Sequence, residues 1–330
     1  MYKKLIFIPM LFSITFAEAI EHDSIQYFQT TPFIPFASAP PASETTPSQS
    51  TNAPTTSITL TLDSRGLWTA PANAIFSRKI SDHTLEGQMV DSTIPVYTWN
   101  MWGFQSKGGF SSTNNETAAQ YKNGRLKEQI DVLYQLFSKS PEAIVCLQEV
   151  HQTSLNARLE ILNSLSALNV SAEYLTQTNS APFGQVILYR KDRYKPVKAY
   201  KPSTPDNYSS GAAGRFISTA DARQTNRVLK VYFEELTGKQ RQIAVVNVHL
   251  AYQSPNLPNL LDELIAYSQG KAPKTLAVIA GDFNHTINSY TPPNSTVTVK
   301  QVGKSVVFSN GASKTKQTQD NVDGIITVQP

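Results

Sequence analysis

Oxygen-bearing side chains follow apolar runs at several places in the sequence, and a histidine follows another. Carboxylate and amide oxygens are the ligands that Mg²⁺ and Ca²⁺ prefer. His249 differs in kind, because an imidazole can take up or release a proton near neutral pH. The four segments are Thr98-Trp99-Asn100, Leu147-Gln148-Glu149, Asn247-Val248-His249-Leu250 and Ala280-Gly281-Asp282-Phe283-Asn284. Together they predict a site for a hard divalent cation, with a proton-transferring group beside it.

Each segment by itself also has an ordinary structural interpretation. Asn100 is typical of a turn or a helix cap, and Gly281-Asp282-Phe283-Asn284 is typical of a turn. Gln148-Glu149 fits a strand that meets solvent, and His249 fits a hydrogen-bonded structural histidine. The prediction therefore depends on the order of the segments and on the apolar run before each.

The elements that position these residues are short strands alternating with helices, from Ile94 to Pro330. Such alternation predicts one α/β layered domain over 94–330, and ligands gather at strand ends in such sheets. The predicted strands are Val96–Thr98, Ile144–Leu147, Val186–Tyr189, Val228–Phe233, Ile243–Val248, Leu276–Ala280, Val297–Val299, Val306–Phe308 and Val322–Val328. The predicted apolar helix faces are Leu126, Ile130, Leu133, Tyr134 and Phe137, then Leu155, Leu159 and Leu162, then Leu257, Leu260, Leu261 and Leu264.

The chain before Ile94 has three parts. Residues 1–19 run from two lysines through an apolar stretch to Ala17-Glu18-Ala19, which predicts a secretory signal peptide and a secreted or periplasmic protein. Residues 20–57 form an arm rich in Pro, Ser and Thr, which is expected to be disordered. Residues 58–93 are an N-terminal extension of unknown role, in which the alternation of Ile58–Leu62 suggests a strand.

Charge and cysteine content narrow the choice of partners. The chain has a net charge of +4, while Ile94 to Pro330 carries 24 Lys and Arg against 17 Asp and Glu, a net +7. A basic excess favours binding to a polyanion such as nucleic acid or to an anionic membrane surface.

No apolar run reaches the roughly 20 residues of a spanning helix, so no stable membrane insertion is expected. The single cysteine, Cys146, is expected to be a buried core thiol.

In their order, the four segments resemble motifs of the endonuclease/exonuclease/phosphatase superfamily, which includes deoxyribonuclease I, neutral sphingomyelinases and the catalytic subunit of cytolethal distending toxin. The resemblance runs from Ile94 to the C-terminus, and Gly281-Asp282-Phe283-Asn284 is its most diagnostic part. It implies a deoxyribonuclease I-like four-layer α/β sandwich, with two packed mixed β-sheets flanked by helices.

The resemblance also implies roles for single residues. Glu149 and Asn100 would hold the metal, which is Mg²⁺ or else Ca²⁺ or Mn²⁺. His249, Asp282 and Asn284 would be catalytic. These assignments are read from the family motifs.

Two further residues belong to the resemblance, and one motif is missing from its expected place. Arg227 would bind the substrate phosphate, and Asp323 would orient a second catalytic histidine. The family ends with a further strand bearing a Ser-Asp-His motif, whereas this sequence stops at Pro330. Asp82-His83 lies upstream of the expected domain and is not taken as a replacement. The fold is therefore expected to lack its last strand.

The leading hypothesis is a secreted, divalent-metal-dependent endonuclease that hydrolyses DNA phosphodiester bonds by in-line attack of water. One alternative is a phosphoesterase acting on a phospholipid, namely sphingomyelin or a phosphoinositide. Another is a catalytically impaired family member that acts as a binding protein, as the missing motif suggests. The N-terminal arm also leaves room for a protein partner.

Overall fold

The computed structural model describes part of the chain. The described residues are 61–62, 68–69, 75–80, 83–101, 117–151, 156–176, 183–197, 216–224, 227–252, 254–270, 275–292, 294–301, 308–310, 313–315 and 323–330. The predicted signal peptide and arm lie outside these residues and stay predictions.

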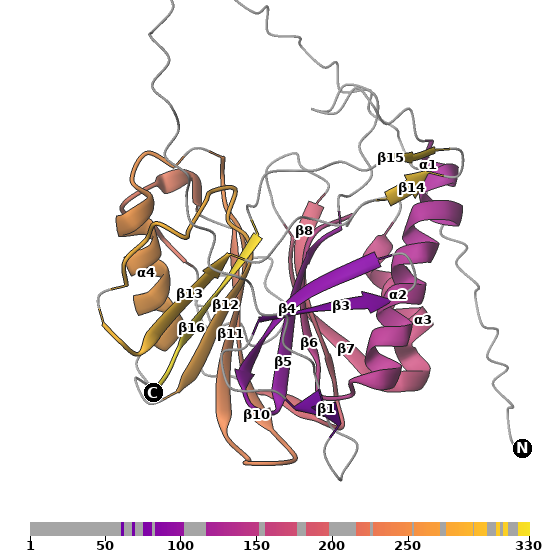
Figure 1. Ribbon diagram of the computed structural model, residues 1–330. Coiled ribbons are helices and arrows are strands. Elements are labelled where there is room, and N and C mark those ends of the chain that lie inside the picture. The colour runs from indigo at the N-terminus through magenta and orange to yellow at the C-terminus, as the bar shows by residue number, and fades with distance from the viewer. Residues whose placement is uncertain are drawn as a thin grey trace, which may run out of the picture. The chain divides into compact units, whose positions relative to one another are not determined.

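Two six-stranded mixed sheets make up most of the described structure (Figure 1). The first has the order β3 (Ile75–Ile80), β4 (His83–Asp91), β5 (Ile94–Asn100), β6 (Ile144–His151), β8 (Phe183–Arg190), β7 (Val170–Thr176). The second has the order β13 (Val297–Gln301), β16 (Asp323–Val328), β12 (Leu276–Asp282), β11 (Gln242–His249), β10 (Val228–Glu235), β9 (Tyr194–Val197). The pairs β5–β6 and β11–β12 are parallel, and the other pairs are antiparallel.

The two sheets pack face to face over an apolar core. Val96 and Ile144 of the first sheet share a buried cluster with Val245 and Val278 of the second. Cys146 is buried in the same cluster, as the sequence predicted. Loss of hydration there raises the pKa of its thiol. Because strand residues alternate between faces, the other sides of both sheets carry their own apolar side chains and need a second cover.

Helices supply that cover on both outer faces, which confirms the predicted four-layer sandwich. On the first sheet, Trp99 belongs to a buried cluster with residues of α2 (Leu126–Lys139) and α3 (Ala157–Leu165). The second sheet has a corresponding cluster with α4 (Leu257–Gln269). The shorter helical segments are α1 (Ala118–Gln120), η1 (Tyr121–Arg125), η2 (Ser166–Leu168) and η3 (Ala222–Gln224). Within the described part of the chain, no helix has the length and apolar character to cross a membrane.

The predicted helix faces are correct in the main for α2 and α4, although Tyr134 of α2 is 43% exposed, and only in part for α3. Leu162 packs partly buried against the helix-side cluster, and Leu155 lies outside the described residues. Leu159 was expected to be buried, but its side chain is 43% exposed. The buried face of α3 consists of Ala157, Ile161 and Leu165, which are four residues apart. A spacing of four follows one side of a helix, so α3 is rotated relative to the expected leucine face.

The first sheet begins upstream of Ile94, where the sequence analysis placed the start of the domain. β4 pairs antiparallel with β5, and β3 pairs with β4. Leu85 and Met89 of β4 are buried in the helix-side core, so this hairpin is part of the sandwich. The boundary between residues 93 and 94 therefore falls within the sheet, at the turn that joins β4 to β5.

Two small hairpins complete the described structure. β1 (Thr61–Leu62) pairs with β2 (Trp68–Thr69), and β14 (Phe308–Asn310) pairs with β15 (Ser313–Thr315). The strand suggested at Ile58–Leu62 is thus represented by its last two residues, and the one at Val306–Phe308 by a strand that begins at Phe308.

Candidate metal site

The two central strands of the second sheet place His249 and Asp282 side by side. β11 and β12 are parallel neighbours, and their register pairs His249 with Asp282. Gly281 lets these strands approach closely, because a Cβ at this position would lie 2.0 Å from the carbonyl oxygen of Val248. The glycine in the Gly-Asp-Phe-Asn motif therefore has a steric function in holding the site together.

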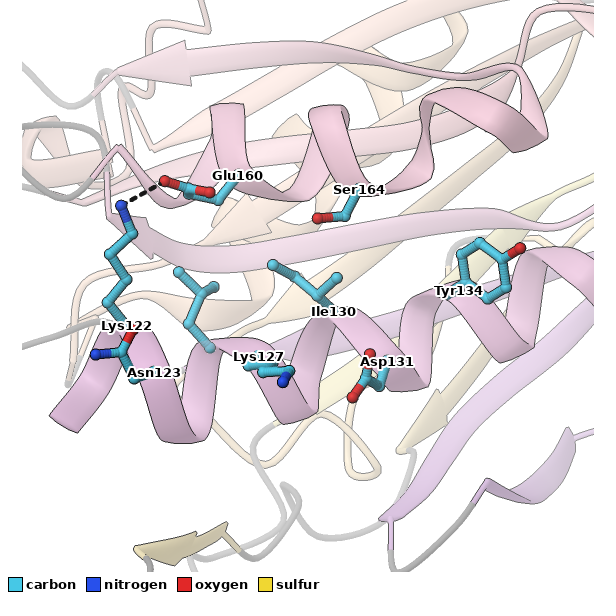
Figure 2. A pocket seen from close by; sticks show the side chains of 9 residues that line it. Lys122, Asn123, Lys127, Ile130, Asp131, Tyr134, Glu160 and Ser164 are labelled. Carbon is cyan, nitrogen blue, oxygen red and sulfur yellow. Dashed lines mark ion pairs between the residues drawn. The ribbon is translucent and has the colours of Figure 1, made fainter. Parts of the chain in front are cut away.

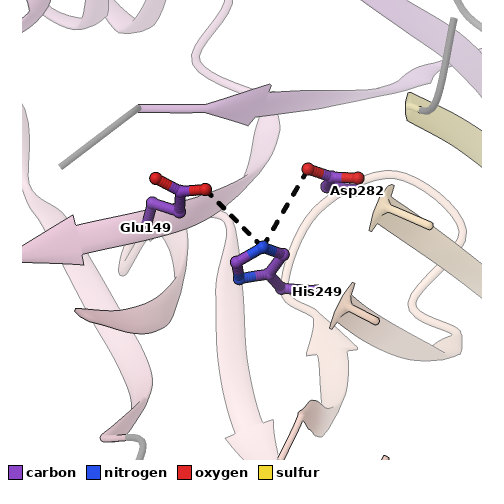
Figure 3. A group of neighbouring side chains, drawn as sticks. All are labelled: Glu149, His249 and Asp282. Carbon is purple, nitrogen blue, oxygen red and sulfur yellow. Dashed lines mark ion pairs between the residues drawn. The ribbon is translucent and has the colours of Figure 1, made fainter. Parts of the chain in front are cut away.

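A bulge in β6 positions Glu149. The pairing of β6 with β8 shifts register between Leu147 and Val150, and Glu149 has a φ of 53°, in the left-handed region. Bulges of this kind redirect a side chain out of the regular alternation of a strand. The Glu149 Oε1 atom lies 3.6 Å from His249 Nε2, so the bulge brings a carboxylate of the first sheet to the second (Figure 3).

Asn100 joins the two carboxylates. Its Nδ2 donates hydrogen bonds to Glu149 Oε1 at 3.2 Å and to Asp282 Oδ2 at 2.9 Å. The Asp282 Oδ2 atom also lies 4.0 Å from His249 Nε2. One potential ligand atom from each of Glu149, His249 and Asp282 lies within 4.8 Å of the others. Figure 3 shows these three side chains converging.

This donor set fits a divalent cation. Two carboxylates this close repel each other, and a cation between them offsets that repulsion. The second carboxylate oxygen of Glu149, Oε2, is buried and has no hydrogen-bond partner among the described residues. A buried carboxylate oxygen is costly unless a partner or an ion satisfies it. Glu149 and Asp282 therefore offer the oxygen ligands that such an ion requires.

Asn284 and Arg227 contact residues of the candidate metal site. The backbone N–H of Asn284 donates to Asp282 Oδ1 at 2.7 Å, and its side-chain Nδ2 donates to the Leu250 carbonyl at 2.8 Å. Arg227 Nη1 donates to the carbonyl of His249 at 3.3 Å. Burial lowers the pKa of the Arg227 guanidinium from its usual value.

Asp323 opens β16 at the same end of the second sheet. Its register partner is Asp282, and it is buried, with 4% of its surface exposed. Gln301 donates to its backbone carbonyl at 2.7 Å. The structure thus brings all seven predicted site residues to one end of the two sheets, while their chemical roles stay predictions.

The sequence analysis gave no role to three polar residues that connect the sheets beneath the site. Gln148 Nε2 donates to Asn247 Oδ1 at 2.8 Å, and Thr98 donates to Gln148 Oε1 at 3.4 Å. Asn247 Nδ2 in turn donates to the carbonyls of Leu147 and Val186 at 2.8 and 3.0 Å. The sequence did contain a signal for this network, because a polar residue interrupts each of two otherwise apolar strands. Gln148 directly precedes Glu149, and Asn247 lies two residues before His249.

Replacing Asn247 by Leu is expected to destabilise the fold by about 2–3 kcal/mol, because unsatisfied buried polar groups each cost about 1–3 kcal/mol. Gln148 would lose an acceptor, and two backbone carbonyls would lose a donor. Urea unfolding of Asn247→Leu measures the loss. The matched control is Asn163→Leu, on the exposed side of α3, where an effect within about 0.5 kcal/mol is expected. Equal stabilities of the two variants would contradict the connecting role.

A separate cavity of about 450 Å³ lies along α2 and α3 (Figure 2). Its lining includes Lys122 and Glu160, whose side chains form an ion pair at 2.7 Å. Tyr134 also borders it and is 43% exposed. None of the seven predicted site residues lines this cavity, so it is distinct from the candidate metal site.

A family model described as "Endonuclease/Exonuclease/phosphatase family" matches residues 97–300. This range covers more than half of the chain and includes Asn100, Glu149, His249, Asp282 and Asn284. A search of curated proteins finds no match.

Several solved structures are similar to this chain. An endonuclease/exonuclease/phosphatase from Bacteroides vulgatus is 19% identical, with a TM-score of 0.47, over 71% of this chain and 86% of that one. A mannosyl-6-phosphatase from Bacteroides thetaiotaomicron is 15% identical, with a TM-score of 0.47, over 72% of this chain and 85% of that one. ANGEL2, described as a 2′,3′-cyclic phosphatase, is 20% identical, with a TM-score of 0.40. That match covers 59% of this chain and 54% of ANGEL2.

Proposed function

The chain belongs to the endonuclease/exonuclease/phosphatase family, and we propose that it is a divalent-metal-dependent phosphodiesterase that hydrolyses DNA. The observation that carries the proposal is the convergence of Glu149, His249 and Asp282 at the ends of three strands from two sheets. A phosphodiester substrate is supported by the net charge of +7 between Ile94 and Pro330, because a basic surface attracts the DNA backbone.

The proposed metal ligands are Glu149, Asp282 and Asn100. When bound, a cation such as Mg²⁺ would act as a Lewis acid that stabilises negative charge on the phosphate oxygens. Asn100 holds both carboxylates through its amide N–H groups and so keeps the ligand atoms in place before the ion binds. Such preorganisation avoids a cost of rearrangement during the reaction.

The remaining residues act on the substrate and on water. His249 is proposed to transfer a proton, and Asn284 to position water or phosphate beside Asp282, to which its backbone is already bonded. Arg227 uses its remaining guanidinium N–H groups to bind a phosphate oxygen, while one of them is held by the carbonyl of His249. This arrangement places a positive charge next to the proton-transferring group.

Export is proposed from the N-terminal sequence. The signal-peptide pattern of residues 1–19 would direct the protein out of the cytoplasm, and residues 20–57 would form an arm that is free to contact a protein partner. N-terminal sequencing of protein recovered from the medium or periplasm tests this. Recovery of cytoplasmic protein that retains residues 1–19 would argue against it.

The function is tested by incubating the protein with supercoiled plasmid DNA and Mg²⁺. Nicking is expected, with complete loss in excess EDTA and recovery when Mg²⁺ is restored, since the cation supplies the charge stabilisation. Parallel assays use liposomes containing sphingomyelin or a phosphoinositide. Head-group release without DNA nicking would replace DNA by a phospholipid as the substrate. DNA binding without turnover in any divalent metal would instead indicate a binding protein.

A further inference from the structure

An exposed tyrosine follows the strand that ends in His249. Tyr252 lies three residues after His249 and is 66% exposed. Between them, Leu250 donates its backbone N–H to the carbonyl of Asp282 at 2.9 Å. The Leu250 carbonyl in turn accepts a hydrogen bond from the Asn284 side chain at 2.8 Å. Tyr252 therefore lies two residues from backbone that is bonded directly to the candidate metal site.

Hydrogen bonds also hold the chain on both sides of Tyr252. The backbone N–H of Ala251 donates to Gln224 Oε1 at 2.9 Å, and that of Ser254 donates to His285 Nε2 at 2.8 Å. Because these bonds are present in the protein alone, little ordering of the backbone is needed when a ligand binds. A tyrosine ring adds a large contact surface with only two side-chain torsions to fix. The segment thus presents an aromatic ring on a largely ordered backbone.

Arg223 adds a cationic group beside this tyrosine. Its Nε and Nη2 atoms donate to the Asp221 carboxylate at 2.9 and 2.8 Å. Its Nη1 atom donates to the backbone carbonyl of Tyr252 at 3.5 Å. The two bonds to the buried Asp221 carboxylate fix the plane of the guanidinium, while 53% of the Arg223 side chain is exposed. Arg223 is therefore an oriented cation at the surface.

Arg223 also lies close to Arg227. Burial lowers the pKa of the Arg227 guanidinium, and the positive charge of Arg223 lowers this pKa further, so the two cations repel each other. Arg227 donates to the carbonyl of His249, and Arg223 donates to that of Tyr252. The negative charges of successive phosphates would offset the repulsion between two such guanidinium groups. The cations thus extend from the candidate metal site toward the exposed tyrosine.

We propose that Tyr252 and Arg223 form a subsite for an unpaired nucleotide next to the phosphodiester bond that is cleaved. The Tyr252 ring stacks on the base, and Arg223 binds a phosphate of the same strand. A base inside a duplex is covered on both faces by its neighbours, so this stacking requires an unpaired base. The preferred substrate is accordingly single-stranded DNA or an unpaired stretch within a duplex. The proposal rests on the proposed phosphodiesterase function.

Binding in EDTA tests the stacking without turnover. Fluorescence anisotropy compares oligothymidylate with an abasic strand of the same length. Tyr252→Ala is expected to weaken binding of oligothymidylate by about 5- to 100-fold, the usual contribution of one stacked base. Binding of the abasic strand should stay within about twofold, and Tyr252→Phe should bind both strands as the wild type does.

Tyr134→Ala is the matched control, because Tyr134 is also an exposed tyrosine, at 43%, but lies on α2. It should bind both strands with unchanged affinity. The stacking role is overturned if Tyr252→Ala binds oligothymidylate as tightly as the wild type, or loses equal affinity for both strands. It is also overturned if the wild-type protein does not bind oligothymidylate.

Salt dependence tests Arg223. Each phosphate contact to a single strand contributes about 0.7 to the slope of log affinity against log salt concentration. Arg223→Gln is expected to reduce this slope by about that amount on both strands, while Arg223→Lys, which keeps the charge, should retain it. In the control Arg190→Gln, the lost side chain also donates through Nε to an aspartate two residues away, Asp192, at 2.9 Å. Arg190 ends β8 at the opposite end of the first sheet from Glu149, so its slope should not change. An unchanged slope in Arg223→Gln would remove Arg223 from the subsite.

Cleavage separates this proposal from the proposed function. With Mg²⁺, the wild-type protein is expected to cut a single strand faster than the same sequence in a duplex. Tyr252→Ala should lower kcat/KM on the single strand by at least about fivefold, because a stacked base is lost. Equal or faster cleavage of the duplex by the wild type would overturn the preference for an unpaired nucleotide. If the wild type cleaves neither substrate, the proposed function fails and the binding measurements alone decide the subsite.

Discussion

Replacing Glu149 by Gln is expected to lower metal-dependent DNA hydrolysis by at least about 10³-fold, since the cation supplies several kcal/mol of charge stabilisation and 1.4 kcal/mol is tenfold. Glu149 is the carboxylate that the β6 bulge delivers, and its Oε2 atom is the buried oxygen left for an ion. Asp282→Asn is expected to cause a loss of similar size, because Asp282 supplies the facing carboxylate. Both turnover and Mg²⁺ affinity should fall, which plasmid nicking and calorimetry measure.

Glu160 provides the matched carboxylate control. It is half-buried on α3, away from the candidate metal site, and its side chain forms an ion pair with Lys122. Surface pairs of this kind contribute about 0–1 kcal/mol, so Glu160→Gln should retain full turnover and stability. Unchanged Mg²⁺ affinity and nicking in Glu149→Gln would remove Glu149 from the metal site.

Gly281→Ala is expected to cost more than about 4 kcal/mol of stability, in the range reserved for severe backbone and steric conflicts. The added Cβ would lie 2.0 Å from the carbonyl oxygen of Val248 and 2.8 Å from its nitrogen. Both are backbone atoms of the paired strand β11, so they can move only if the central strands separate. Denaturant unfolding and the yield of folded protein measure the loss.

Gly124 is the control for this substitution. It lies in the helical segment η1, and a Cβ there would meet nothing within 4 Å. Alanine in a helix is favoured over glycine by about 0.5–1 kcal/mol, so Gly124→Ala should be neutral or slightly stabilising. If Gly281→Ala unfolds at the same denaturant concentration as Gly124→Ala, the close approach of β11 and β12 does not limit residue 281.

Several of the strands that the sequence identified, β11 and β12 among them, consist largely of apolar residues. β12, from Leu276 to Asp282, is buried along its whole length, and β11 is buried at six of its eight positions. Strands buried on both faces leave such runs, which local patterning detects. β4 and β7 mix apolar with polar residues and were not predicted, because their position depends on pairing with distant segments.

The amino-acid sequence by itself determined the donor types of the site, the α/β class and the family, because strand ends, turn residues and short motifs are local features. It identified Asn100, Glu149, His249 and Asp282 without showing their distances. The tertiary structure decided how they meet: through the β6 bulge, the close packing at Gly281 and the network below the site. It also placed β4 beside β5, upstream of the expected start of the domain. Such proximity arises from the register of strands far apart in the chain, which no local pattern encodes.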